Sequence, residues 1–411
     1  KGRAFELCRL WTGKTIMQLE WDEPNTKKTN GKVLVNCSAG QLQSRRKERE
    51  KKFGIESRVC DSNEDVSYGI NITNYEKLER FTAKDFSGVV LDESSILKSY
   101  TGKIRTKIID NFRNVPYKLA CTATPAPNDY MELGNHSEFC GVMTRAEMLS
   151  MFFVHDGGQT SKWRLKGHAN DIFWQWMSSW SVFIDNPINL GYQMDGYDLP
   201  ELNVKEIIVD GEHTINESLT LTERRVARKE TLKLRCEAAA ELVNNSDEQW
   251  LVWCDMNDES KLLHELIEQS EEVKGSDKQQ HKTDAMLGFS DGNVKALVTK
   301  PSIAGFGMNW QNCHNMIFTG LSDSYEKYYQ ALRRCWRFGQ EHDVNVYIII
   351  SKKEGAVKEN IERKQEDFRK MQKAMTELTK EITKKELKST CRISTPYHPE
   401  KDMILPNWEE F

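Results

Sequence analysis

Three consecutive residues near the start of the chain, Gly13, Lys14 and Thr15, have the types that bind nucleotide phosphates. They match the end of the pattern GxxxxGK(S/T) and are followed by the helix-prone stretch IMQLEW. In this pattern, backbone amides at a helix N-terminus cradle the phosphates, the lysine reaches their outer oxygens, and the hydroxyl binds Mg²⁺. Residues 8–12 are bulky, however, and Cys8 stands where the first glycine belongs. The triplet therefore predicts a phosphate site only together with other motifs.

An acidic pair, Asp92 and Glu93, directly follows the apolar run GVVL. Carboxylates in this position can hold Mg²⁺ and activate the attacking water in phosphoryl transfer. Farther along, the stretch ACTATP places Thr122 and Thr124 at the end of another apolar run. Each feature alone also fits an ordinary strand end, so their order along the chain is what makes them informative.

A glycine-containing turn, GFGMN, follows the apolar run ALVT and includes Gly305, Gly307 and Asn309. Glycines in such a turn let the backbone approach a ligand closely. The same pattern also fits a plain connection between a strand and a helix.

Two arginines lie three residues apart in QALRRCWRFGQ, at Arg334 and Arg337, and Gln340 closes this string. Residues three apart lie on one face of a helix, and two guanidinium groups on one face suit a polyphosphate. A solvated basic face is the alternative interpretation, because it accounts for most pairs with this spacing.

The elements that must position these residues alternate between strands and helices. Residues 1–140 contain the strand candidates KVLVN, GINITNY, GVVLDES and YKLACTATP, separated by charged segments of helical length. Residues 204–351 repeat the pattern with VKEIIVD, QWLVWCD, VKALVT, NMIFTG and VNVYIIIS, and with one long charged helix at 217–244. Short buried strands that alternate with helices predict parallel sheets. We therefore expect two α/β lobes.

Three further segments do not follow this alternation. Residues 141–203 contain four tryptophans and predict an aromatic insertion or helical bridge between the lobes. Residues 352–392 carry 13 Lys and Arg against 8 Asp and Glu, which predicts a basic helical arm. The arm is either a solvated helix with an apolar seam or a surface that faces nucleic acid. Residues 393–411 contain three prolines and predict a tail.

Composition excludes several classes of protein. The 411 residues carry 58 basic and 62 acidic side chains, a net charge of -4, so the chain is no polycation. The ten cysteines are scattered without a CxxC pair, which argues against a zinc ribbon or a disulfide framework and favours a reducing, cytoplasmic location. Because no apolar run approaches the ~18 residues that span a bilayer, we expect no membrane partner.

In this order, GKT, DESS, TATP, GFGMN and QALRRCWRFGQ resemble the motifs of superfamily-two helicases, and RCWRFGQ is most similar to Swi/Snf-type DNA-dependent ATPases. Two segments resemble the sequences of phage and prophage members of this family: ELGNHSEFCGVMTRAEMLSMFFVHDGG and TSKWRLKGHA. The resemblance implies two RecA-like lobes, with ATP between them and Mg²⁺ as cofactor. It further implies ATP-driven translocation on DNA, most often duplex, in the bacterial host cytoplasm if the chain is phage-encoded.

The resemblance also implies roles for individual residues. ATP binding falls to Gly13, Lys14, Thr15, Gly307, Asn309 and Gln340. The Mg²⁺ ligands implied are Thr15 and Asp92. Catalysis falls to Lys14, Glu93 as base, Arg337 as arginine finger and its companion Arg334.

Two further sets of roles concern coupling and the DNA track. Coupling of hydrolysis to lobe movement falls to Thr122 and Thr124. Contacts with the DNA backbone fall to Thr73, Asn74, Thr299 and Lys300.

Two alternative functions stay open on the sequence. The bulky residues 8–12 fit a DNA-binding scaffold whose phosphate loop has decayed. The motor part of a restriction, modification or replication complex is the second alternative, with phage or host proteins as partners. Since no methyltransferase or nuclease motif is visible, a partner chain would have to supply such an activity.

Overall fold

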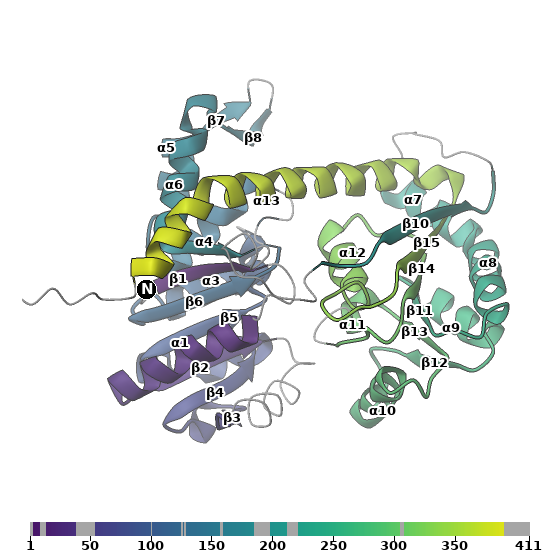
Figure 1. The fold of residues 1–411 in the computed structure, drawn as a ribbon, viewed down its shortest axis with the longest axis horizontal. Helices are drawn as coiled ribbons and strands as arrows, with labels where there is room; N and C mark the ends of the chain where they lie inside the picture. Colours follow the sequence, from purple (N-terminus) through teal and green to yellow (C-terminus); the bar gives the residue numbers. More distant parts are fainter. Residues whose placement is uncertain are drawn as a thin grey trace, which may run out of the picture.

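The computed structural model describes residues 3–8, 14–37, 54–99, 101–124, 126, 129–156, 159–184, 198–211, 221–304 and 308–389. These residues form two α/β lobes that lie side by side and a long C-terminal helix that extends from one to the other (Figure 1). Two lobes with parallel sheets were expected from the sequence, and this prediction is confirmed.

The first lobe contains a seven-stranded sheet in which every pairing is parallel, with the order β3-β4-β2-β5-β6-β1-β9. Its strands are β1 (Arg3–Cys8), β2 (Lys32–Cys37), β3 (Ser57–Val59), β4 (Gly69–Asn74), β5 (Gly88–Asp92), β6 (Tyr117–Thr122) and β9 (Ser181–Ile184). Four of them coincide with the predicted apolar runs. All five residues of β5 are buried, as expected for a strand covered on both faces.

The helices of the first lobe are α1 (Lys14–Thr29), α3 (Lys103–Asn111), α4 (Leu133–Cys140), α5 (Arg145–Phe152) and α6 (Asn170–Trp180). Helix α5 begins with a capping box, in which the Thr144 hydroxyl accepts from the backbone amide of Glu147 and the Glu147 carboxylate accepts from that of Thr144. The antiparallel hairpin of β7 (Phe153–Asp156) and β8 (Gln159–Leu165) projects away from the sheet (Figure 1).

The expected boundary of the first lobe at residue 140 differs from the structure. Strand β9 lies inside the expected insertion 141–203, yet it pairs with β1 as the edge strand of the first sheet. Helix α6 precedes it directly and buries Trp174 and Trp180. The tryptophans of α6 therefore belong to the core of the first lobe.

The second lobe contains a six-stranded parallel sheet with the order β10-β15-β14-β11-β13-β12. Its strands are β10 (Leu202–Ile208), β11 (Trp250–Trp253), β12 (Ser270–Val273), β13 (Ala296–Thr299), β14 (Asn315–Thr319) and β15 (Val344–Ile350). Its helices are α7 (Leu221–Glu230), α8 (Leu232–Asn244), α9 (Asn257–Leu266), α10 (Gln279–Ser290), α11 (Pro301–Ala304) and α12 (Tyr325–Leu332). The single helix expected at 217–244 is thus two helices, with a break at Thr231.

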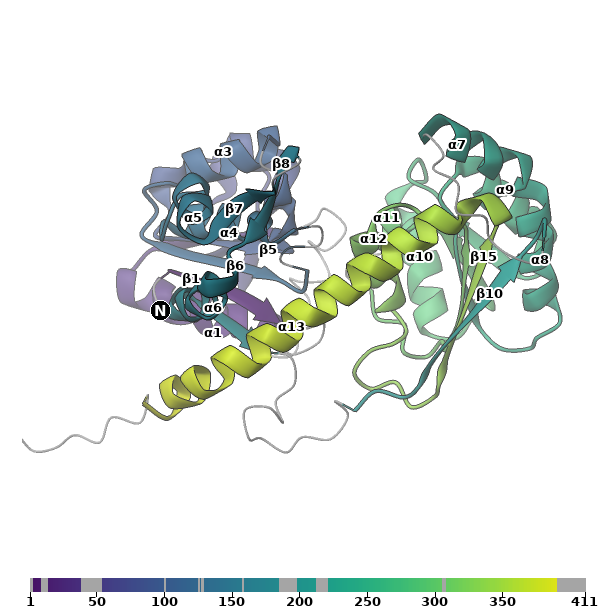
Figure 2. The same ribbon diagram turned by 90° about the horizontal axis from the view of Figure 1, so that it is seen from above.

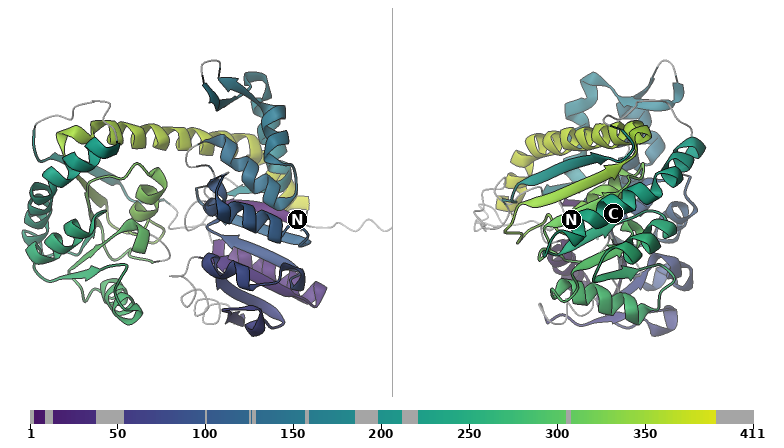
Figure 3. Two further views of the ribbon diagram at one scale, coloured as in Figure 1. Left: turned by 180° about the vertical axis from the view of Figure 1, so that it is seen from behind. Right: turned by 90° about the vertical axis from the view of Figure 1, so that its right-hand side faces the viewer.

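The long helix α13 (Gly355–Ser389) follows β15 and the short 3₁₀ turn 352–354. Figures 2 and 3 show that it runs from the second lobe across to the first. Near its middle, Phe368 packs on Tyr325 and Tyr329 of α12 at ring-centroid distances of 5.8 and 5.5 Å. Beyond this point it packs against α6 and β9 of the first lobe. In the described part of the chain, no helix is long and apolar enough to cross a membrane.

Candidate functional site

The lysine and the acidic pair of the sequence motifs meet at one end of the first sheet. Lys14 is the first residue of α1, Asp92 is the last residue of β5, and Glu93 follows it, so the N-terminus of α1 lies beside the end of β5. The Lys14 ammonium lies 2.9 Å from Glu93 Oε1, and both side chains are largely buried. One turn farther along α1, the Gln18 amide donates to Asp92 Oδ1 at 2.9 Å. Gln18 was not predicted, although its position four residues after Lys14 places it on the same helix face.

The backbone around the acidic pair is held in an unusual conformation. Glu93 has φ 53° and ψ 53°, the left-handed region that non-glycine residues enter at a cost of about 1–3 kcal/mol. The Tyr75 hydroxyl donates to the carbonyl of Asp92 at 2.7 Å and fixes the end of β5. Burial, reinforced by the neighbouring Asp92, raises the pKa of Tyr75 well above its usual value, so it stays a neutral donor.

The donor set fits a hard divalent cation next to phosphates. Asp92 is 1% exposed, and Glu93 Oε2 is buried without a hydrogen-bond partner. Carboxylate oxygens are the ligands that Mg²⁺ prefers, and a buried acceptor without a donor is costly unless something binds it. Gly13 lies outside the described residues, and of Thr15 only the helical backbone is described, so these two predicted ligands stay predictions.

The arginine pair lies in the second lobe, just after α12. Arg334 and Arg337 are 2% and 4% exposed, and each donates to the carbonyl of Met308, at 2.9 and 3.1 Å. Asn309 is the next residue and is exposed. The structure therefore brings two predicted residues, Arg334 and Arg337, to one carbonyl, whereas Gly307 lies outside the described residues.

Gln340 is held by hydrogen bonds within the second lobe. Its amide nitrogen donates to the carbonyls of Gln311, Cys313 and Cys335 at 3.0, 3.1 and 3.2 Å, and its oxygen accepts from the backbone amide of His342. Both the amide nitrogen and the oxygen of Gln340 are thus hydrogen-bonded within the second lobe. Gln340 therefore holds the loop after Met308 against the arginine-bearing segment, and its contact with ATP stays a prediction.

Of the two threonines of the TATP motif, Thr122 ends β6 and Thr124 lies two residues after it, and both are fully buried. The Thr122 hydroxyl accepts from the backbone amide of Thr124 at 3.1 Å, which closes the turn. The Thr124 hydroxyl donates to Glu326 Oε1 on α12, at 3.3 Å, and so reaches the second lobe. Glu326 also forms an ion pair with Lys98 of the first lobe. Neither Glu326 nor Lys98 was predicted, because an acidic residue near a helix start is an ordinary feature.

The residues predicted to contact DNA differ in how exposed they are. Thr73 and Thr299 are 0% exposed, and their hydroxyls donate to the carbonyls of Cys60 and Val273, both at 3.0 Å. These two hydroxyls tie neighbouring strands together, and the contacts of Thr73 and Thr299 with DNA stay predictions. Asn74 caps the 3₁₀ turn that follows β4 by accepting from the amide of Lys77. Lys300 is partly exposed and donates to Asn257, so it stays a candidate phosphate contact.

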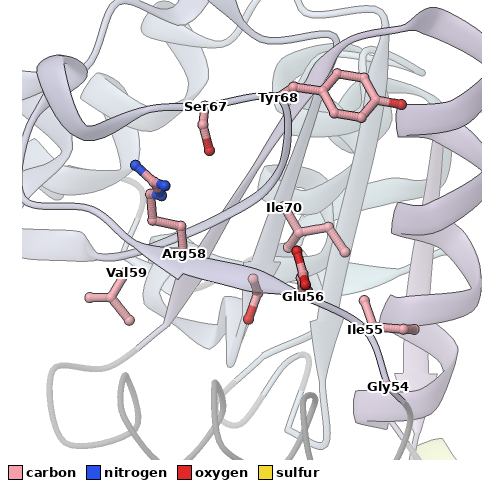
Figure 4. Close-up of a pocket in the computed structure, with 9 residues that line it drawn as sticks. Gly54, Ile55, Glu56, Arg58, Val59, Ser67, Tyr68 and Ile70 are labelled. Carbon is pink, nitrogen blue, oxygen red and sulfur yellow. The ribbon is translucent and has the colours of Figure 1, made fainter.

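A separate surface pocket of about 610 Å³ lies at the edge strand of the first sheet (Figure 4). It is lined by residues 54–59 together with Ser67, Tyr68 and Ile70, and so by none of the predicted site residues. Among the described residues, three or more His, Cys, Asp or Glu side chains nowhere gather as a metal centre would require.

Comparison with known proteins gives one family match. Residues 234–339 match the family described as the helicase conserved C-terminal domain. No curated protein matches the chain. Among solved structures, the chain is similar to the Sulfolobus solfataricus SWI2/SNF2 ATPase core in complex with dsDNA, with 18% identity over 85% of this chain and 83% of that chain and a TM-score of 0.42. The segment from α8 to Gly339, which carries the arginine pair, is thus similar to the C-terminal domain of helicases.

Proposed function

We propose that this protein is a nucleic-acid-dependent ATPase that uses ATP hydrolysis to move along duplex DNA. The observation that carries the proposal is the division of the site between the lobes. Lys14, Asp92 and Glu93 form a buried cluster in the first lobe, and a buried arginine pair lies in the helicase-like segment of the second. A phosphate chain held by the first group and neutralised by the second would make hydrolysis depend on how the lobes are arranged.

Each residue of the first-lobe cluster has a distinct part in the proposed reaction. Lys14 would bind the outer phosphate oxygens, which compete for its ammonium group with the carboxylate of Glu93. Asp92, oriented by Gln18, would hold Mg²⁺, and the cation would offset the charge that develops on the phosphates. Glu93 would then accept the proton of the attacking water, and its unbonded Oε2 is the atom available for this.

The second lobe would contribute positive charge. Arg337 is the proposed finger and Arg334 its companion, and both are already oriented by the carbonyl of Met308. Preorganised donors of this kind stabilise a transition state without reorganising during the reaction. Hydrolysis would remove the phosphate that the two lobes share, and the change in lobe arrangement would move DNA held at Lys300 and at the turn after Asn74.

The proposed track is duplex DNA, as the resemblance to Swi/Snf-type ATPases implies. We further propose replication or modification proteins as partners, because the sequence of residues 132–169 resembles phage and prophage members, and copurification would test them. A DNA-binding scaffold without ATPase activity is the alternative that the first experiment must distinguish.

The test is phosphate release by the intact protein with Mg²⁺, in the presence and absence of duplex DNA, for the wild type and Glu93→Gln. We expect DNA-stimulated turnover in the wild type and a loss of at least about 100-fold in Glu93→Gln, with DNA affinity retained, because a general base contributes that much or more. Glu79→Gln is the matched control, since Glu79 is an exposed carboxylate of the same lobe that pairs only at the surface with Lys107. DNA binding without turnover in the wild type would contradict the proposal and support the scaffold. Phosphate release with single-stranded DNA and with RNA of the same sequence shows which nucleic acid stimulates turnover.

A further inference from the structure

Glu326 is a buried charge that the proposed mechanism does not use. It lies in the first turn of α12, two residues after the cap residue Ser324, and only 6% of it is exposed. Moving a carboxylate out of water is costly unless the charge is paired and hydrogen-bonded. The contacts that satisfy Glu326 therefore indicate what keeps it at this position.

Both carboxylate oxygens of Glu326 point to the first lobe. Oε1 accepts from the hydroxyl of Thr124, at 3.3 Å, and Oε2 pairs with the ammonium of Lys98. Thr124 lies two residues after the end of β6. Lys98 ends the 3₁₀ turn that begins at Ser94, immediately after Glu93. One side chain of the second lobe thus contacts the segments that leave both predicted nucleotide-site strands, β5 and β6.

On its own side, Glu326 is connected to the arginine pair. The Gln330 amide, one helical turn farther along α12, donates to Glu326 Oε1 at 3.4 Å. The carbonyl of Gln330 accepts from Arg334 Nε at 3.0 Å, and Arg334 shares the Met308 carbonyl with Arg337. The contacts therefore run without interruption from Thr124 in the first lobe to both arginines in the second.

We propose that Glu326 is a positioning residue that couples the two lobes: it links the turn after the acidic pair and the TATP turn to the placement of the arginine pair. This inference rests on the proposed function and deepens it. A shift of Ser94–Lys98 or of Thr124 on binding at the first-lobe site changes what Glu326 contacts. Helix α12 responds, and the arginines at its end move with it.

The test compares DNA-stimulated kcat, basal kcat, the KM for ATP and DNA affinity in the wild type, Glu326→Ala and Glu326→Gln. Glu326→Ala should lower the DNA-stimulated kcat about 10-fold, within the usual range of coupling between two sites, while basal kcat, KM and DNA affinity change less than about 3-fold. Glu326→Gln keeps the oxygen that accepts from Thr124 but loses the charge opposite Lys98, so it should fall between the two. Glu138→Gln is the matched control, because Glu138 pairs with Arg105 within the first lobe alone.

A double-mutant cycle separates the ion pair from general damage. Lys98→Met combined with Glu326→Gln should lower the DNA-stimulated kcat no further than the worse single variant, since both remove the same link. Additive losses, or an equal fall in basal kcat and in DNA-stimulated kcat, would overturn the coupling role. So would a DNA-stimulated kcat of Glu326→Ala within 3-fold of the wild type.

Small-angle scattering keeps this inference distinguishable from the proposed function. Without nucleotide, Glu326→Ala should shift the intact protein to a larger radius of gyration, because a contact between the lobes is lost, whereas Glu138→Gln should match the wild type. If the wild type hydrolyses no ATP with any nucleic acid, the proposed function fails. The radius of gyration alone then tests whether Glu326 links the two lobes. An unchanged radius in Glu326→Ala would then overturn it.

Discussion

At the scale of single residues, the proposed function depends on the arginine pair, through which the second lobe would take part in the chemistry. Arg337 is 4% exposed, and one of its terminal nitrogens donates to the carbonyl of Met308. Arg337→Ala should lower the DNA-stimulated kcat by about 10³-fold or more, as in other NTPases that lose an arginine finger. Phosphate release measures this, and fluorescence anisotropy should show unchanged affinity for labelled duplex DNA.

The conservative variant distinguishes charge from geometry at the same position. Arg337→Lys keeps one positive charge but loses the planar fork, so it should recover only a small part of the lost kcat. Full activity in Arg337→Lys would assign Arg337 a purely electrostatic role, and full activity in Arg337→Ala would exclude it as the finger.

How far residue roles could be predicted depends on where their partners lie in the sequence. Lys14, Asp92 and Glu93 belong to local motifs, and the structure brings them together. Gln18, Tyr75 and Glu326 escaped prediction because their partners lie 74, 17 and 202 residues away. Thr73 and Thr299 were assigned to DNA because a strand-end threonine looks the same in sequence whether it ties two strands or faces a ligand.

At the scale of elements, the apolar β-branched runs predicted strands well, and short or charged strands were missed. Strand β12, SEEV, carries two glutamates. Strand β1, RAFELC, precedes the GKT motif, and the prediction concerned the loop of that motif and not the residues before it. Strand β9 has only four residues and directly follows a helix rich in tryptophan. In each case pairing with a distant strand supplies the stabilisation that local propensity does not, and sequence patterns carry little information on such pairing.

His136 connects several elements of the first lobe and gives it a pH-dependent stability. It lies on α4, contacts the carbonyl and hydroxyl of Ser94 at 3.1 and 3.2 Å, and stacks on Phe5 of β1 with ring centroids 4.2 Å apart. Burial lowers the pKa of His136 from 6.5 to about 4. The unfolded chain therefore takes up a proton as the pH falls below 6.5, while the folded protein does not until about pH 4. The stabilisation is complete above pH 6.5 and is lost as the pH falls through this window.

Between pH 7.5 and pH 5, this single group should cost the wild type about 2 kcal/mol of unfolding free energy, at about 1.4 kcal/mol per pH unit below 6.5. His136→Gln, which does not titrate there, should lose correspondingly less over the same interval in urea unfolding followed by tryptophan fluorescence. His264→Gln, an exposed histidine of α9, is the control and should follow the wild type. Equal pH dependence in His136→Gln and the wild type would show that His136 is not the buried neutral group described here.

At the scale of the whole molecule, α13 is the element that belongs to both lobes. Its exposed basic side chains lie next to acids one turn away, as in Arg363–Asp367, Lys370–Glu366 and Lys373–Glu377. Its apolar face is buried at Phe368, Met371 and Met375. The described part of the arm therefore has the character of a solvated helix with an apolar seam, the simpler of the two interpretations that its charge allowed.

The apolar seam of α13 should hold the lobes in their observed arrangement. Met371 lines a pocket of about 310 Å³ with Phe153 and Trp163 of the first lobe, and Met375, one turn farther, is 0% exposed. Burying two such side chains stabilises docking by roughly 3–6 kcal/mol, and replacing both with glutamate should release this half of the helix.

Met371→Glu with Met375→Glu should therefore enlarge the radius of gyration in small-angle scattering and lower DNA-stimulated turnover, while each sheet stays folded by circular dichroism. Lys370→Glu with Lys373→Glu changes exposed residues of the same two turns and should leave the scattering curve unchanged, since neither lysine lies in the seam. If the methionine double variant scatters like the wild type, contacts such as Lys98–Glu326 hold the lobes instead. The arm would then pack on the first lobe without determining how the lobes are arranged.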